Sequence, residues 1–132
     1  MKYLIDTNIL IYWMKNKPDT LKKLLSNEDD LAVSSISVAE LIYGAKKSLY
    51  IEKNMQAAIK ILSYFNIVDF SKDDAFEYGD IRAHLEKQGT PIGDHDIQIA
   101  AQARRLGLVV VTANIREFSR IRNLCVENWT KS

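Results

Sequence analysis

At 132 residues the chain has the length of one domain, and we expect residues 1–132 to fold as a single unit around a buried core. With 47% hydrophobic and 27% charged residues, it is neither a disordered nor a fibrous protein by composition. No apolar run approaches the roughly 18 residues that span a membrane, and Asp6 interrupts the opening run, so we expect no signal peptide and a cytoplasmic location. The single Cys125 excludes an internal disulfide bond, and its apolar neighbours predict a buried position.

Net charge gives no direct indication of a partner, because 18 Lys and Arg residues nearly balance 17 Asp and Glu residues. If four acids gather in one site, however, the remaining side chains carry a net charge of +5. Such a surface permits, without demonstrating, binding to a polyanion such as nucleic acid.

Strand and helix patterns alternate along the chain. Short apolar runs predict strands at residues 2–5, 31–34, 67–69, 108–112 and 124–126. Helical periodicity predicts helices at about residues 37–47, 51–65, 72–88 and 94–106, the last two ending at Gly89 and Gly107. This alternation predicts an α/β domain with a mostly parallel central sheet of about five strands flanked by helices. Ligands bind such sheets beyond the carboxyl ends of the strands, so acids placed there are candidate site residues.

Two acids occupy such positions in the first half of the chain. Asp6 directly follows the first strand, where it either holds a cation or caps a turn. Glu40 lies in the helix after the second strand, but Ser37 precedes it by three residues, which also fits a capping box. Position alone leaves both alternatives open for each acid.

Two further acids open the helix predicted at 94–106. We expect Asp94 to be its N-cap and Asp96 to lie in its first turn, where the helix dipole alone favours an acid. Side chains two residues apart do not share a helix face, so we expect only one of them to point toward the strand ends.

The most apolar strand, 108–112, leads to the last candidates. Thr112 and Asn114 stand at its carboxyl end, where they could orient a ligand by hydrogen bonds. Glu117 follows them and is either a site residue or an exposed charge beside Arg116 and Arg120.

Parallel topology would bring these acids to one edge of the sheet. Carboxylates gathered so closely repel one another, by about 4 kcal/mol per pair at ~4 Å and an effective dielectric of 20. No lysine recurs beside them, so a divalent cation is the expected compensation. Oxygen ligands favour Mg²⁺, with Mn²⁺ as a substitute, held by a few carboxylates and retained waters.

Four stretches of the chain, taken in order, resemble the PIN-domain toxins of the VapC family, the ribonucleases of bacterial toxin–antitoxin pairs. They are Asp6-Thr7-Asn8 after the first strand, residues 35–44, residues 89–100 and residues 110–118, with Glu127-Asn128-Trp129 near the end. The Thr-Pro-Ile-Gly and Arg-Glu-Phe segments look most like members described as cutting initiator tRNA in its anticodon loop. Each stretch is weak by itself, and the specificity comes from all four in order.

The resemblance implies a metal-dependent endoribonuclease with Asp6, Glu40 and Asp96 as core acids, of which Asp6 and Asp96 are direct Mg²⁺ ligands. Asp96 is expected in place of Asp94 because the family's acid directly precedes the apolar-x-Ile/Leu-Ala helix.

The chain departs from the family pattern at one position. Many PIN domains carry an aspartate where this chain has Asn114, so Glu117 is expected to supply the fourth acid. The supporting residues are expected to be Asn8, Thr112 and Asn114.

The resemblance also implies a partner, a cognate VapB-type antitoxin whose extended tail covers the acids, in a homodimer or a toxin–antitoxin hetero-oligomer. We expect an arginine of that tail to replace the metal. Apolar tail residues are expected to pack on Tyr12 or Trp13.

Three alternatives compete with this interpretation. A PIN-like RNA-binding module without catalysis remains open. A phospho-accepting receiver domain is disfavoured, because Asp6 stands alone after the first strand and no lysine follows the strand at 108–112. A metal-free ribonuclease needs two converging histidines, whereas His84 and His95 belong to different predicted helices. Outside the site, we expect Trp13 and Trp129 in the core or facing a partner, and the arginines at 104–105 on a solvated face.

Overall fold

A computed structural model describes residues 1–16 and 30–130 of the chain. In chain order its elements are β1 (Tyr3–Ile5), α1 (Thr7–Asn16), β2 (Leu31–Ser34), α3 (Ser35–Lys46), α4 (Ile51–Leu62), β3 (Asn66–Val68), α5 (Lys72–Lys87), α6 (Asp94–Leu106), β4 (Val109–Val111), α7 (Ile115–Phe118) and β5 (Val126–Glu127). The five strands form one sheet in the order β3-β2-β1-β4-β5, and all of its pairs are parallel. The predicted α/β class and parallel sheet are confirmed.

Alternate strand residues face two separate hydrophobic cores. Leu4 and Val110 pack with α5, α6 and α7, whereas Ile5 and Val111 pack with α1, α3 and α4. A parallel sheet covered on both faces needs apolar residues at every position, which is why its strands read as continuous apolar runs. Trp13 and Trp129 belong to the second core and are 1% and 4% exposed, as the sequence predicted.

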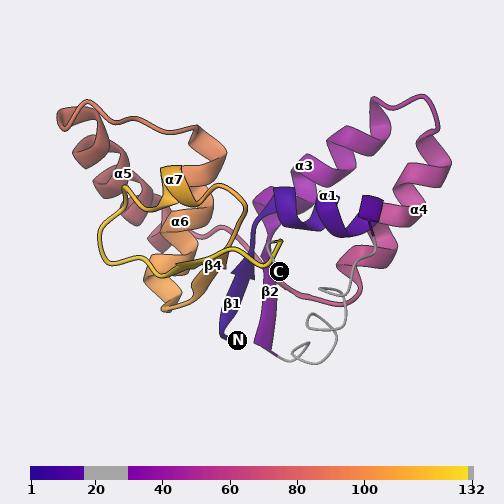
Figure 1. Cartoon of the computed structure of the whole chain (residues 1–132), viewed down its shortest axis with the longest axis horizontal. Coiled ribbons are helices and arrows are strands. Elements are labelled where there is room, and N and C mark those ends of the chain that lie inside the picture. Colours follow the sequence, from indigo (N-terminus) through magenta and orange to yellow (C-terminus); the bar gives the residue numbers. More distant parts are fainter. Residues whose placement is uncertain (17–29, 131–132) are drawn as a thin grey trace.

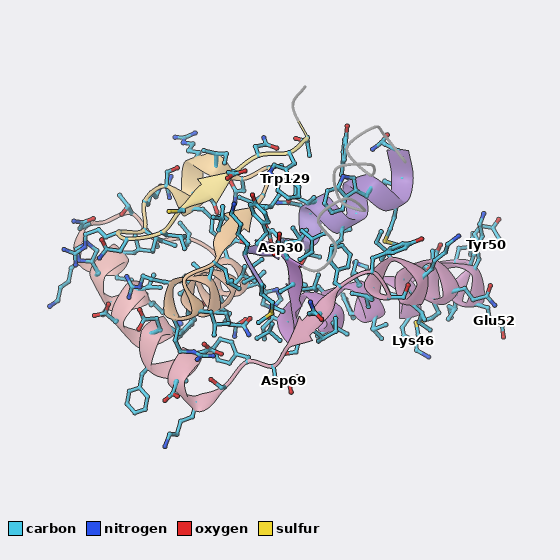
Figure 2. All side chains as sticks on the ribbon, turned by 90° about the horizontal axis from the view of Figure 1, so that it is seen from below. Asp30, Lys46, Tyr50, Glu52, Asp69 and Trp129 are labelled. Carbon is cyan, nitrogen blue, oxygen red and sulfur yellow. The ribbon has the colours of Figure 1, made fainter. Side chains whose placement is uncertain are left out.

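The two helix groups diverge beyond the carboxyl end of β1. Figure 1 shows α1, α3 and α4 on one side of the central strands and α5, α6 and α7 on the other. Figure 2 shows the α3–α4 hairpin reaching away from the sheet, with Lys46, Tyr50 and Glu52 toward its far end. The residues that follow the central strands therefore lie between two helical walls.

Most element boundaries follow local sequence signals. Helix α6 spans the predicted residues, and Gly89 and Gly107, with φ of 71° and 69°, adopt the expected left-handed backbone. Helix α5 begins with a capping box between Ser71 and Asp74. The strand predicted at 67–69 starts one residue earlier, and the last strand lies at Val126–Glu127.

Some predictions outside the site were incomplete or wrong. Helices α1 and α7 were not predicted, because each follows a strand end closely and offers few turns of periodicity. Cys125 is exposed instead of buried, since it immediately precedes β5, which is an edge strand. Among the described residues, none of the helices has the length and apolar character that crossing a bilayer requires.

Candidate active site

Asp6 lies at the carboxyl end of β1, in the centre of the sheet. Its backbone N–H donates to the carbonyl of Val111 at 2.8 Å, which ties it to the neighbouring strand β4. Its carboxylate accepts hydrogen bonds of 2.8 Å from both the Thr112 hydroxyl and the Thr7 N–H, and the residue is only 3% exposed. The Asp6 carboxylate thus binds the first N–H of α1 and the hydroxyl of the residue that follows β4.

The electrostatic environment of Asp6 disfavours its charge. Burial raises the pKa of this carboxyl, the hydrogen bonds from Thr112 and Thr7 oppose the rise, and the negative charge of Glu40 adds to it. A bound cation would reverse this balance.

Glu40 lies in α3, beyond its first turn. Strand β2 runs directly into this helix, whose N-cap is Ser34, with its hydroxyl accepting from the Ile36 N–H at 3.0 Å. The capping-box alternative, which required Ser37 as the cap, is therefore wrong. The Glu40 carboxylate instead accepts a hydrogen bond from the Thr7 hydroxyl at 2.7 Å and pairs with His95 Nδ1 at 3.1 Å.

Asp94 and Asp96 point in different directions from the start of α6. The N-cap is Gly93, without a side-chain hydrogen bond, so the prediction that Asp94 is the cap is wrong. Asp94 turns toward α5, where it accepts from the Tyr78 hydroxyl at 3.0 Å and pairs with Arg82 at 3.2 Å. Asp96 turns toward the strand ends.

Asn114 joins Asp96 to the last acid. Its side-chain amide donates to Asp96 Oδ2 at 3.2 Å and to Glu117 Oε2 at 3.0 Å. At the position where the family resemblance predicted an aspartate, this chain therefore places a neutral donor between two carboxylates. The structure brings Glu117 beside Asp96, where the sequence had left it as either a site residue or an exposed charge.

The supporting polar residues hold the central carboxylate in place. The Asn8 amide donates to Asp6 Oδ2 at 3.1 Å, and the Thr112 hydroxyl accepts from the Asn114 N–H at 2.9 Å. All these partners are uncharged, so they orient Asp6 without neutralising it.

The four acids form one electrostatic unit. Burial raises the pKa of Asp96 to about 7, and the charges of Asp6, Glu117 and Glu40 contribute to the rise. In residues 1–16 and 30–130 no lysine or arginine pairs with any of the four acids. The site therefore carries an excess of negative charge, which a bound cation would offset.

The arrangement suits a metal held by few protein ligands. Within the described ranges, no three Asp, Glu, His or Cys side chains are arranged to hold one ion together. Mg²⁺ does not require such a cage, because it keeps several waters and is commonly bound through one or two carboxylates. Asp6 and Asp96, both with raised pKa values, fit that role.

Sequence reasoning missed three residues of this site. Thr7 and Ser37, both buried, lie with their hydroxyl oxygens 2.8 Å apart and support Glu40. His95, for which the sequence predicted no role in the site, contacts Glu40. Their position beside Asp6, Glu40 and Asp96 in the sequence was the available signal, but local patterns do not show which helices meet.

Comparison with known proteins shows the family of the chain. The family model described as PIN domain matches residues 3–124. Ribonuclease VapC2 of Haemophilus influenzae is 47% identical over 130 residues, which cover 98% of this chain and 98% of that protein. The chain belongs to the VapC family of PIN-domain ribonucleases.

Other VapC relatives match over nearly the whole length as well. The tRNA(fMet)-specific endonuclease VapC of Salmonella typhimurium is 42% identical, with 98% of both chains covered. Among solved structures, DNA-bound VapBC from Salmonella typhimurium matches with a TM-score of 0.94 at 42% identity and 98% coverage of both chains. VapBC2 from Rickettsia felis, bound to a DNA fragment from its promoter, matches with a TM-score of 0.92 at 41% identity, covering 98% of this chain and 99% of that one.

Proposed function

We propose that residues 1–132 act as one PIN domain that hydrolyses RNA phosphodiester bonds with the help of Mg²⁺, as the toxin of a type II toxin–antitoxin pair in the cytoplasm. The observation that carries the proposal is the group of four carboxylates with which no lysine or arginine of residues 1–16 and 30–130 forms an ion pair. Relatives named as ribonucleases at 42–47% identity support the activity.

In the proposed mechanism the chain's residues divide the work. Asp6 and Asp96 hold the cation, while Asn8, Thr112 and Asn114 keep these carboxylates oriented through the hydrogen bonds described above. A bound Mg²⁺ supplies a lowered pKa for the attacking water and stabilises charge on the phosphate oxygens.

The two remaining acids, Glu40 and Glu117, have separate roles beside the metal ligands. Glu40 accepts the proton of the attacking water, and Glu117 adds negative charge beside Asp96. Water attacks the phosphorus and the bond to the ribose 3′-oxygen breaks, so the products carry 5′-phosphate and 3′-hydroxyl ends.

The proposed substrate is initiator tRNA, cut in the anticodon loop. The support is the relative from Salmonella typhimurium named as a tRNA(fMet)-specific endonuclease, which is 42% identical over 98% of both chains. The competing function is a PIN-like module that binds RNA without cutting it.

Removal of the metal tests the proposal. Purified protein incubated with initiator tRNA should cut it in Mg²⁺ or Mn²⁺ and should lose all measurable cutting in EDTA, because the proposed ligands are all oxygen atoms. The measurement is the length and end chemistry of the products, with an elongator tRNA as the specificity control. Undiminished cutting in EDTA would contradict the metal mechanism, and tRNA binding without cutting in Mg²⁺ would favour the binding module.

The proposed partner is a VapB-type antitoxin, as in the VapBC complexes that share this fold. A groove of about 370 Å³ between α1, α3 and α4 offers a seat for its tail, and the lining includes Ile11, Met14, Leu41, Ala45 and Glu40. Trp13, at 1% exposure, is too buried for the contact expected from the sequence, whereas Ile11 is 39% exposed. An arginine of the tail would pair with the acids in place of the metal.

Competition between metal and antitoxin is the expected consequence. Mn²⁺ at about ten times its Kd should weaken binding of the antitoxin's C-terminal peptide by about tenfold. The double change Asp6→Asn with Asp96→Asn should weaken it as well, whereas Asp94→Asn should not, because Asp94 faces α5. Titration calorimetry measures the affinity for the peptide in four samples: the wild type without Mn²⁺, the wild type with Mn²⁺, the double variant and Asp94→Asn. If both metal and the double change left the affinity unaltered, the tail would inhibit by covering the site instead of by charge pairing.

A further inference from the structure

The Glu40 carboxylate is held at both of its oxygens by side chains of two other helices. Oε1 accepts a hydrogen bond of 2.7 Å from the Thr7 hydroxyl, on α1. Oε2 lies 3.1 Å from Nδ1 of His95, on α6. Glu40 itself belongs to α3, so this single carboxylate ties together elements from both helix groups.

The two contacts of the Glu40 carboxylate differ in how deeply their partner side chains are buried. A hydroxyl has one proton, so if Thr7 gives its proton to Glu40, then Ser37 must donate to Thr7 across their 2.8 Å separation. Thr7 and Ser37 are 7% and 0% exposed, so packing fixes this side of the carboxylate. His95, with a side chain 61% exposed, is the contact on the open side.

The first turn of α6 explains why His95 reaches Glu40. Successive helical residues are turned by about 100° from one another, so three neighbouring side chains leave the helix in three directions. Asp94 binds Tyr78 and Arg82 on α5, His95 meets Glu40 on α3, and Asp96 faces the strand ends. The contacts of Asp94 with α5 thus hold the start of α6 in the position from which His95 reaches Glu40.

We infer that His95 is a positioning residue for RNA cleavage, whose Nδ1–H holds the Glu40 carboxylate toward Asp6 and Asp96. The inference rests on the proposed function, in which Glu40 accepts the proton of the attacking water. Glutamate has three rotatable side-chain bonds, and without His95 its open oxygen is free to turn toward solvent. The role requires a proton on Nδ1, which places the neutral imidazole in the Nδ1–H tautomer.

Two substitutions of His95 test whether cleavage requires the N–H donor or only a side chain of similar size. His95→Asn keeps an N–H donor close to the place of Nδ1, whereas His95→Leu has a similar size and no donor. We expect His95→Leu to lower kcat by about tenfold, equivalent to about 1.4 kcal/mol, with KM unchanged, and His95→Asn to stay within about threefold of the wild type. Melting temperatures should hardly change, because the side chain is 61% exposed.

The other histidine provides the matched control. His84→Asn changes the same residue type on α5, outside the acid cluster, and should leave cleavage unchanged. Equal activity of His95→Leu and the wild type would overturn the inference, as would equal losses in His95→Leu and His95→Asn. A loss confined to KM would show instead that His95 contacts RNA. If the wild type fails to cut RNA in Mg²⁺, the proposed function fails, and the next measurement then tests the contact between His95 and Glu40 by itself.

Nitrogen NMR of the imidazole rings tests the contact without reference to activity. The chain has only two histidines, so spectra of His95→Asn assign the signals. We expect Nδ1 of His95 to carry the proton in the wild type, and this preference to be lost in Glu40→Ala. An Nδ1 signal that is the same in both proteins would show that Glu40 does not engage His95.

Discussion

Replacing Asp96 by asparagine is expected to lower the rate of RNA cleavage by about 10²- to 10³-fold without unfolding the protein. Asparagine has nearly the same shape but no negative charge, so it removes one of the two proposed metal ligands. Asp94→Asn should keep cleavage within about threefold, because Asp94 is turned toward α5 and its side chain is 62% exposed. Cleavage rates under saturating Mg²⁺ provide the comparison. A larger loss for Asp94→Asn than for Asp96→Asn would mean that the wrong aspartate has been assigned to the metal.

The pH dependence of stability gives a second test of the Asp96→Asn substitution. The folded-state pKa of Asp96 is raised to about 7, above the ordinary value near 3.8, so its protonated form favours the folded state. In EDTA the wild type should therefore lose stability as the pH rises from about 4 to 7. Asp96→Asn lacks this loss and should melt at an equal or higher temperature than the wild type at pH 7.5. A variant that melts much lower would indicate a structural role for Asp96.

Replacing Arg105 by methionine is expected to lower the free energy of unfolding by about 2–3 kcal/mol, or the melting temperature by roughly 10 °C. Arg105 pairs with Asp74, which is 0% exposed and belongs to the capping box at the start of α5. Methionine keeps the length of the side chain but leaves a buried carboxylate without its cation. The value lies below that of a fully buried pair, because the Arg105 side chain is 30% exposed.

The sign of the pH effect distinguishes this pair from the acid cluster. Burial by itself would raise the pKa of Asp74, but hydrogen bonds from Arg105 and Ser71 hold it below its usual value. The pair therefore stabilises the fold above pH ~4, and this stability is lost as the pH falls through the folded-state pKa. The difference between wild type and Arg105→Met should be largest near pH 7 and should shrink below pH 4.

A second arginine tests whether the burial of Asp74 causes the large loss of stability expected for Arg105→Met. Arg82 forms two ion pairs, with Glu86 and Asp94, against one for Arg105, but the Arg82 side chain is 46% exposed. Arg82→Met should therefore lower the melting temperature much less than Arg105→Met. Equal shifts would show that the buried position of Asp74 contributes nothing special.

The sequence by itself determined the order of the strands and of helices α3, α4, α5 and α6, and it placed Asp6 directly after the first strand. Continuous apolar runs predicted a sheet covered on both faces, and the glycines at 89 and 107 marked the ends of α5 and α6. Asp6 and Asp96 were placed from the strand ends and from the resemblance to VapC toxins. These signals are local, or belong to short motifs, so they can be read without knowing which elements pack together.

Tertiary structure alone decided which polar side chains meet. Asp94 carried the pattern of an N-cap, yet the packing of α6 on α5 turns it to Tyr78 and Arg82. Arg105, expected on a solvated face, reaches a buried acid 31 residues away.

The same is true of Glu40. Its spacing from Ser37 fitted a capping box, yet the direct join of β2 to α3 makes Ser34 the cap and leaves Glu40 free to meet Thr7 and His95. Capping and helical periodicity act over three or four residues. The contacts of Glu40, in contrast, join it to residues that are 33 and 55 positions away in the sequence. Only the packing of α1, α3 and α6 around the strand ends brings such residues within hydrogen-bond distance.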